Sequence, residues 1–165
     1  MNFETFTLSV KGWAEARGIY QHSTVSAQLL KGGSELGELC DAIVKGETDK
    51  VKDGIGDTAV CLINANTMLK TGSDLIMSRE VQEALELAGA NDPHRLIGAV
   101  MRSLGGALMV QPDYSHEWIQ GALNELRAVA KSLDFDFGEC CQMAWDEIKD
   151  RKGRMVPGGA FIKED

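Results

Sequence analysis

The sequence predicts an all-α protein. Apolar residues recur three and four positions apart through most of its 165 residues, the spacing that places them on one face of a helix. Residues typical of helix starts and helix ends separate these apolar segments. The length and the ordinary apolar fraction are those of one domain with its own core, spanning residues 1–165. We therefore expect a helical bundle followed by a short non-helical C-terminal tail.

The first helix is expected over residues 3–17, with Gly18 as its C-terminal cap. Trp13 lies on its apolar face. An indole can form one wall of a nucleobase pocket, because bases stack on aromatic rings. A tryptophan in an apolar stripe is more often a core residue, so both interpretations of Trp13 stay open. The stripe consists of Phe3, Phe6, Val10, Trp13 and Ala14.

Two longer helices follow, separated by a short break at residues 45–48. The earlier one runs to about Lys45 and begins after Ser23 or Thr24, either of which is a good N-cap. Thr48 can cap the later one, which continues to about Lys70. Because the break is short, the two helices are expected to be antiparallel neighbours.

Four acidic residues occupy matching positions on these two helices. Glu35 and Glu38 project from one face of the earlier helix, and Asp53 and Asp57 share a face of the later one. A rise of ~1.5 Å per residue, counted outward from the break, places Asp57 level with Glu35 and Asp53 level with Glu38. Four converging carboxylates repel one another unless a cation lies among them, and Mg²⁺ prefers such oxygen ligands.

Three glycines interrupt the helix that carries Glu35. Each costs ~1 kcal/mol relative to alanine in a helix interior, so their presence suggests a specific reason. One reason is close approach of a neighbouring helix, and another is space for a ligand beside the carboxylates. Local fraying or a kink is the rival explanation. The glycines are Gly32, Gly33 and Gly37.

Two polar residues lie near the acidic group. Lys31 precedes Glu35 by one turn, where it can form a helix salt bridge or reach a phosphate. Asn64 follows Asp57 by two turns on the same face. It can orient a sugar or a base, and it can equally be a hydrogen-bonded core amide.

The rest of the chain also shows helical spacing. Ser115 is expected to cap the last helix of this region. The three histidines are read as surface residues, with His22 in a loop, and the four cysteines as reduced thiols in helices, because none has a partner at metal-ligand spacing. Turns are expected at 71–74 and 111–113, and helices at about 78–88, 94–109 and 116–133.

The last helix is expected over residues 137–152 and ends in a cluster of cations. Cations at a helix C-terminus are favoured by the helix dipole alone, so a solvated cap is the simplest interpretation. Several cations so close together in an acidic protein also favour a local anion site. Residues 156–162 should form a non-helical tail that docks on the body or on a partner. The cations are Lys149, Arg151, Lys152 and Arg154.

The acidic spacing resembles the motif of the MazG-like proteins, members of the all-α nucleoside triphosphate pyrophosphohydrolase superfamily, in a form common in bacteriophages. That motif is E-x-x-E followed, on the next helix, by E-x-x-D. Glu35 and Glu38 match its first half, and Asp57 matches its last position. Gly54 stands where the third glutamate belongs, with Asp53 one residue earlier. The local sequence also resembles this group at residues 34–42, 52–57 and 145–155.

The resemblance implies a four-helix-bundle-like MazG core, with residues 74–131 as an added helical pair. It implies that Glu35, Glu38 and Asp57 are catalytic and hold Mg²⁺, with Mn²⁺ as the alternative ion. Asp53 is expected to help hold the metal, either directly or through a water molecule.

The implied reaction converts a ribo- or deoxyribonucleoside triphosphate into its monophosphate and pyrophosphate. The implied assembly is a homodimer or a homotetramer, in which basic residues of the terminal segment contact phosphates. The residues expected to bind substrate are Trp13, Lys31, Asn64, Lys149, Arg151, Lys152 and Arg154.

Composition argues against other broad classes. A net charge of −8 is the wrong sign for coating nucleic acid. No apolar run reaches the length of a membrane span, and the N-terminus lacks the layout of a signal peptide. We therefore expect a cytoplasmic protein, in the host cytoplasm if a phage encodes it.

Two rival functions remain. One keeps the chemistry and changes the substrate to a nucleotide alarmone such as ppGpp. The other is a non-catalytic helical interaction protein, in which the carboxylates form a solvated helix face and the basic end is a docking patch. Acidic pairs at helical spacing are common on exposed helices, so spacing by itself does not separate these functions.

Overall fold

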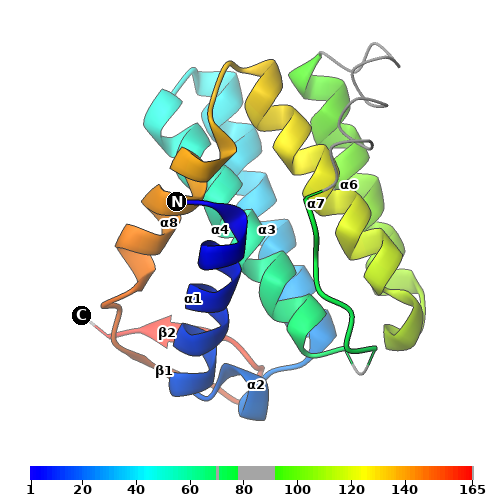
Figure 1. Ribbon diagram of the computed structural model, residues 1–165, viewed down its shortest axis with the longest axis vertical. Coiled ribbons are helices and arrows are strands. Elements are labelled where there is room, and N and C mark those ends of the chain that lie inside the picture. Colours follow the sequence, from blue (N-terminus) through cyan, green and yellow to red (C-terminus); the bar gives the residue numbers. More distant parts are fainter. Residues whose placement is uncertain (70, 78–91, 165) are drawn as a thin grey trace.

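The computed structural model describes residues 1–69, 71–77 and 92–164, and most of them are helical, which confirms the all-α prediction (Figure 1). The short helix expected at 78–88 lies outside the described residues. None of the described helices is both long and apolar enough to cross a bilayer. The helices are α1 (Phe3–Ala16), α2 (Ile19–His22), α3 (Val25–Lys45), α4 (Thr48–Thr67), α6 (Pro93–Met109), α7 (His116–Ser132) and α8 (Phe137–Ile148).

α4 is the central helix of the bundle. It is in contact with α1, α3, α7 and α8 (Figure 1), and most of its residues are buried. α3 lies antiparallel beside it, because Gly46 takes a left-handed conformation with φ of 70° and reverses the chain. The Thr24 side chain caps α3 as expected. The expectation for Thr48 is wrong, since Glu47 precedes α4 and makes no side-chain cap hydrogen bond.

The helical pair expected after residue 74 is present as α6 and α7, which pack on each other and on α3 and α4. Ser115 precedes α7, but its hydroxyl donates to the carbonyl of Ala107 at 3.0 Å and caps no helical N–H group. His116 is not the surface residue that was expected, because it is partly buried with Nδ1 2.8 Å from Asn66 Oδ1. His22 is exposed, but it ends α2 and does not lie in a loop.

The C-terminal segment folds back against the first two helices. α8 ends at Ile148, earlier than expected, and the chain then forms a hairpin of β1 (Gly153–Met155) and β2 (Phe161–Lys163). Two contacts confirm that this tail docks on the body. Ser23 Oγ donates to the Gly159 carbonyl at 2.7 Å, and the Phe161 ring meets the Trp13 ring edge-on at 5.7 Å.

Candidate functional site

Four carboxylates from three helices influence one another strongly. Glu35 comes from α3, Asp53 and Asp57 from α4, and Glu147 from α8. We call them the carboxylate cluster. Burial, followed by repulsion from Asp53, Glu35 and Glu147, raises the pKa of Asp57 to about 7, against a smaller opposing effect of Arg151. Burial and the charges of Glu147 and Glu35 also raise the pKa of Asp53. The cluster therefore holds like charges together against their repulsion.

Two glycines of α4 determine how closely its neighbours approach the cluster. A Cβ at Gly56 would lie 2.4 Å from the Cys140 carbonyl oxygen and 2.6 Å from Ala144 Cβ, so only glycine lets α8 lie here. That contact brings Glu147 to α4. A Cβ at Gly54 would lie 3.0 Å from Leu39 Cβ, so this position faces α3 and has little room for a long side chain. The acidic residue of α4 that joins Asp57 in the cluster is therefore Asp53, next to Gly54.

Glu38 is the fourth acidic residue of the predicted set. It is exposed, and it acts electrostatically on Lys31. Burial disfavours the charge of Lys31, but its hydrogen bond with Glu35 and the charges of Glu35 and Glu38 leave its pKa raised. From the predicted set, the structure brings together Glu35, Asp53 and Asp57. Glu38 is exposed and influences Lys31 beside Glu35. The fourth carboxylate of the cluster, Glu147, was not a candidate from the sequence, because helical spacing does not indicate that α8 packs on α4.

A cavity of about 590 Å³ adjoins the cluster, with Glu35 and Asp57 in its lining. We call it the cluster cavity. Four of the seven predicted substrate-binding residues line it, namely Trp13, Lys31, Asn64 and Arg151. The other three are exposed and lie outside this lining: Lys149, Lys152 and Arg154.

Two cations pair with the carboxylate cluster at the cavity. Lys31 forms a salt bridge with Glu35, as the helix spacing predicts, and Arg151 forms one with Glu147. Among the described residues, no three Asp, Glu, His or Cys side chains are grouped tightly enough to ligate one ion as they stand. The donor set nevertheless fits a hard divalent cation in kind, because such an ion would relieve the repulsion that raises the pKa of Asp57.

Aromatic and amide side chains also line the cluster cavity. Trp13 is buried and lines the cavity, so it is a core residue and a cavity wall at once. The Arg17 guanidinium lies 4.9 Å above its ring. Asn64 and Gln28 are buried and also line the cavity. Gln28 was not a sequence candidate, and its place on the face of α3 seven residues before Glu35 is the signal that would have found it.

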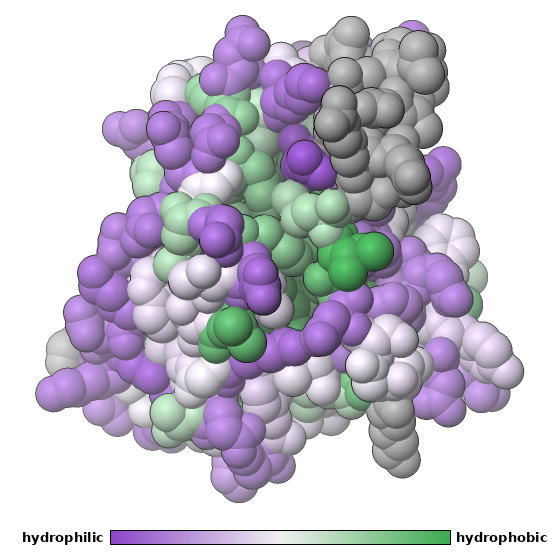
Figure 2. Space-filling view, viewed as in Figure 1, coloured by the Kyte–Doolittle hydropathy of each residue, from purple (hydrophilic) through white to green (hydrophobic). Residues whose placement is uncertain are grey.

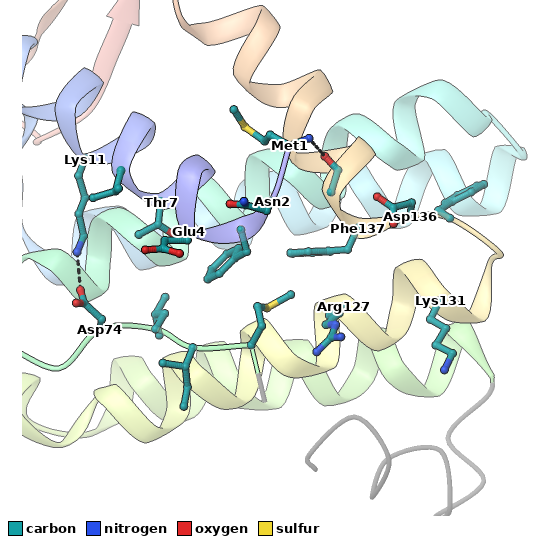
Figure 3. A pocket seen from close by; sticks show the side chains of 17 residues that line it. Met1, Asn2, Glu4, Thr7, Lys11, Asp74, Arg127, Lys131, Asp136 and Phe137 are labelled. Carbon is teal, nitrogen blue, oxygen red and sulfur yellow. Dashed lines mark hydrogen bonds and ion pairs between the residues drawn. The ribbon is translucent and has the colours of Figure 1, made fainter. Parts of the chain in front are cut away.

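A second, larger cavity of about 1060 Å³ opens on the face shown in Figure 2, where apolar residues gather in a hollow. We call it the α1–α7 cavity. Its lining comes from residues 1–11, residues 74–77, α7 and residues 135–138 (Figure 3). Lys11 donates to Asp74 at 2.6 Å across its rim, and this bond lowers the pKa of Asp74.

Comparisons with known proteins give one partial match and no family. No family model matches the chain, and neither does any solved structure. The chain is 38% identical over 55 residues to an uncharacterized 18.2 kDa protein from the rep-hol intergenic region of Haemophilus phage HP1. The match covers 33% of this chain and 34% of the phage protein, so the chain spans about a third of the length of this curated relative. The MazG-like resemblance thus stays a prediction from the acidic motif.

Proposed function

We propose that this protein is a divalent-cation-dependent nucleoside triphosphate pyrophosphohydrolase. The observation that carries the proposal is the carboxylate cluster, which adjoins a cavity containing two cations, an indole and two buried amides. In the reaction, the oxygen of water bonds to the α-phosphorus and the bond to the bridging α–β oxygen breaks. The products are a nucleoside monophosphate and pyrophosphate.

In this proposal, substrate phosphates bind beside the two cations of the cluster cavity and the nucleoside binds beside its aromatic and amide side chains. Lys31 and Arg151 lie in the lining next to the carboxylates, where they can bind the β- and γ-phosphates. Their charge stabilises the pyrophosphate as negative charge develops on the leaving oxygen. Trp13 and Asn64 then bind the nucleoside. The cluster's four acidic groups cannot attract a triphosphate by themselves, so these cations are needed beside the phosphates.

The carboxylates supply ligands and a proton acceptor. Glu35, Asp57 and Asp53 would hold Mg²⁺ or Mn²⁺, with Glu38 from the motif and Glu147 from α8 as the further candidates. A bound divalent ion polarises the α-phosphate and lowers the pKa of a bound water. A cluster carboxylate that does not bind the ion accepts the proton of the attacking water, as a general base must.

The proposal includes the homodimer or homotetramer that the resemblance implies. Lys149, Lys152 and Arg154 are exposed and lie outside the cluster cavity lining of their own chain. In an assembly of this kind they would contact the phosphates bound by a neighbouring subunit. Size measurement by light scattering tests this part separately, and a monomer that is fully active would remove it from the proposal.

Product analysis tests the reaction. The purified protein is incubated with ribo- and deoxyribonucleoside triphosphates, in Mg²⁺ and in EDTA, and nucleotides and phosphate species are resolved. We expect monophosphate and pyrophosphate, formed only with the metal. Diphosphate and phosphate would overturn the proposed bond cleavage. Turnover of ppGpp with no turnover of triphosphates would indicate the alarmone, and neither turnover nor metal binding would indicate an interaction protein.

A further inference from the structure

Two buried amides present one hydrogen-bonding group each to the cluster cavity. Asn64 is 2% exposed, and Tyr20 Oη donates to its Oδ1 at 3.0 Å. Gln28 is 6% exposed, and its Nε2 donates to Ser23 Oγ at 2.9 Å. Within the described residues, no hydrogen bond reaches Nδ2 of Asn64 or Oε1 of Gln28. One donor and one acceptor are therefore left for a ligand.

The orientation of each amide is fixed by a hydroxyl proton. Ser23 has one such proton, and it goes to the Gly159 carbonyl at 2.7 Å. Ser23 Oγ can therefore only accept from Gln28, which makes Nε2 the donor and leaves Oε1 as the acceptor. Tyr20 keeps its proton near neutral pH, because burial raises its pKa to about 12 against the opposing effect of a hydrogen bond with Thr67. In the structure that proton goes to Oδ1 of Asn64 at 3.0 Å, and this arrangement leaves Nδ2 as the donor.

The amides lie at the right distance from the carboxylates to meet a nucleobase. Gln28 precedes Glu35 by seven residues on α3, and Asn64 follows Asp57 by seven residues on the antiparallel α4. Each amide is thus two turns, or about 10 Å, from its acidic residue in the same direction along the bundle. A nucleotide spans such a distance from its α-phosphate to the far edge of its base, whereas the sugar hydroxyls lie nearer the phosphate.

We propose that Asn64 and Gln28 read the hydrogen-bonding edge of the substrate's base, an inference that rests on the proposed pyrophosphohydrolase function. Asn64 Nδ2 donates to a carbonyl or ring nitrogen of the base, and Gln28 Oε1 accepts from a neighbouring N–H group. Trp13 forms the wall beside the ring. A ligand without these groups leaves both buried amides unsatisfied, so the pair discriminates between substrates. Tyr20 and Ser23 are positioning residues for this pair.

Binding of nucleoside monophosphates tests the pair without requiring turnover. Calorimetry compares AMP, GMP, CMP, UMP and dTMP with ribose 5-phosphate, which has no base. We expect at least one monophosphate to bind the wild-type protein 10-fold or more tightly than ribose 5-phosphate, as a buried hydrogen-bonded pair provides about 10- to 100-fold. If none does, the inference is overturned.

Substitutions assign the effect to the two amides. Gln28→Met removes the acceptor and Asn64→Leu removes the donor, each at similar side-chain size and without adding a charge. Each should weaken binding of the preferred monophosphate about 10- to 100-fold and leave binding of ribose 5-phosphate unchanged. Gln21→Met is the matched control, because Gln21 is exposed and bonded to Glu15 at 2.7 Å. Equal weakening of both ligands in a folded variant would show a structural role and overturn the inference.

The positioning role has its own readout. Tyr20→Phe removes the proton that fixes Asn64, so the amide can rotate and offer either group. The ratio of the Kd values of the weakest and the tightest monophosphate should then decrease. A merely structural role would change all five Kd values by the same factor. Binding that follows this pattern without any hydrolysis would retain the amide pair and reject the pyrophosphohydrolase. Hydrolysis without base discrimination would do the reverse.

Discussion

The two cavities of this protein shift the pKa values of their acidic residues in opposite directions. The α1–α7 cavity is the larger, at about 1060 Å³ against about 590 Å³, and its Asp74 is an exposed residue paired with Lys11. The cation lowers the pKa of Asp74. In the cluster cavity, burial and neighbouring carboxylates raise the pKa of Asp57 to about 7. The opposite pKa shifts of these two carboxylates favour the smaller cavity as the functional candidate, because sites built for chemistry hold like charges together.

The largest expected effect is the loss of turnover when the motif carboxylates are neutralised. Asp57→Asn and Glu38→Gln should each lower kcat about 100-fold or more, because each removes ligand charge from the polar site. Neither should lower the unfolding free energy, since neither removes a core contact. Asp74→Asn in the α1–α7 cavity is the matched control and should keep the wild-type rate. A Glu38→Gln protein with wild-type rate would show that Glu38 lies outside the site.

Glu147 gives the next largest effect and tests the structure against the motif. Glu147→Gln should lower kcat about 10- to 100-fold, the range expected for a group that supports metal ligands from outside the motif. Glu139→Gln on the same helix is the control, because Glu139 is exposed and its carboxylate pairs with Lys52 at 3.6 Å. If the two variants behave alike, α8 contributes no functional carboxylate and the motif describes the acidic site by itself.

The difference between motif and structure shows what the sequence could predict. Glu35, Asp53 and Asp57 could be placed together, because α3 and α4 are joined by a short break and helical geometry alone relates them. Glu147 could not, because its position depends on how α8 packs against Gly56. Gln28 likewise gains its orientation from Ser23 and the distant Gly159. Local spacing predicts residues on joined helices, whereas contacts between distant segments require the packed fold.

The glycines of α3 show the same limit. The sequence left three explanations open for these glycines: close approach of a helix, space for a ligand, and fraying. The structure shows that the glycines differ in their surroundings. A Cβ at Gly32 would lie 3.2 Å from Cys61 Cβ, so that glycine lets α3 approach α4. A Cβ at Gly33 or Gly37 would meet nothing within 4 Å. Spacing identifies a glycine that needs a reason, and only the neighbouring helix shows which reason applies.

Two glycine substitutions should change stability in opposite directions. Gly56→Ala forces α8 away from α4, because its Cβ would lie 2.4 Å from the Cys140 carbonyl oxygen, and should lower the unfolding free energy by about 1–3 kcal/mol. Gly33→Ala has space and should raise it by about 1 kcal/mol through helix propensity. Urea unfolding measures both. Gly56→Ala should also lower kcat, because Glu147 and Arg151 move with α8; an unchanged stability would mean that the two helices do not touch here.

The last expected effect is a pH dependence that only the cluster cavity should produce. The pKa of Asp57 is about 7 in the folded protein and about 3.9 in the unfolded chain, so between these values the folded state binds the proton more tightly. In EDTA, its contribution to the unfolding free energy is therefore present at about pH 4 and is lost as pH rises towards 7. The slope is at most ~1.4 kcal/mol per pH unit.

Urea unfolding of wild-type protein and Asp57→Asn at a series of pH values isolates this contribution. The wild-type slope should be steeper than that of the variant in EDTA, and Mg²⁺ should reduce the difference, because the ion competes with the proton for the same carboxylate. Equal slopes in EDTA would mean that Asp57 titrates as an ordinary exposed carboxyl does, and the contrast between the two cavities would disappear.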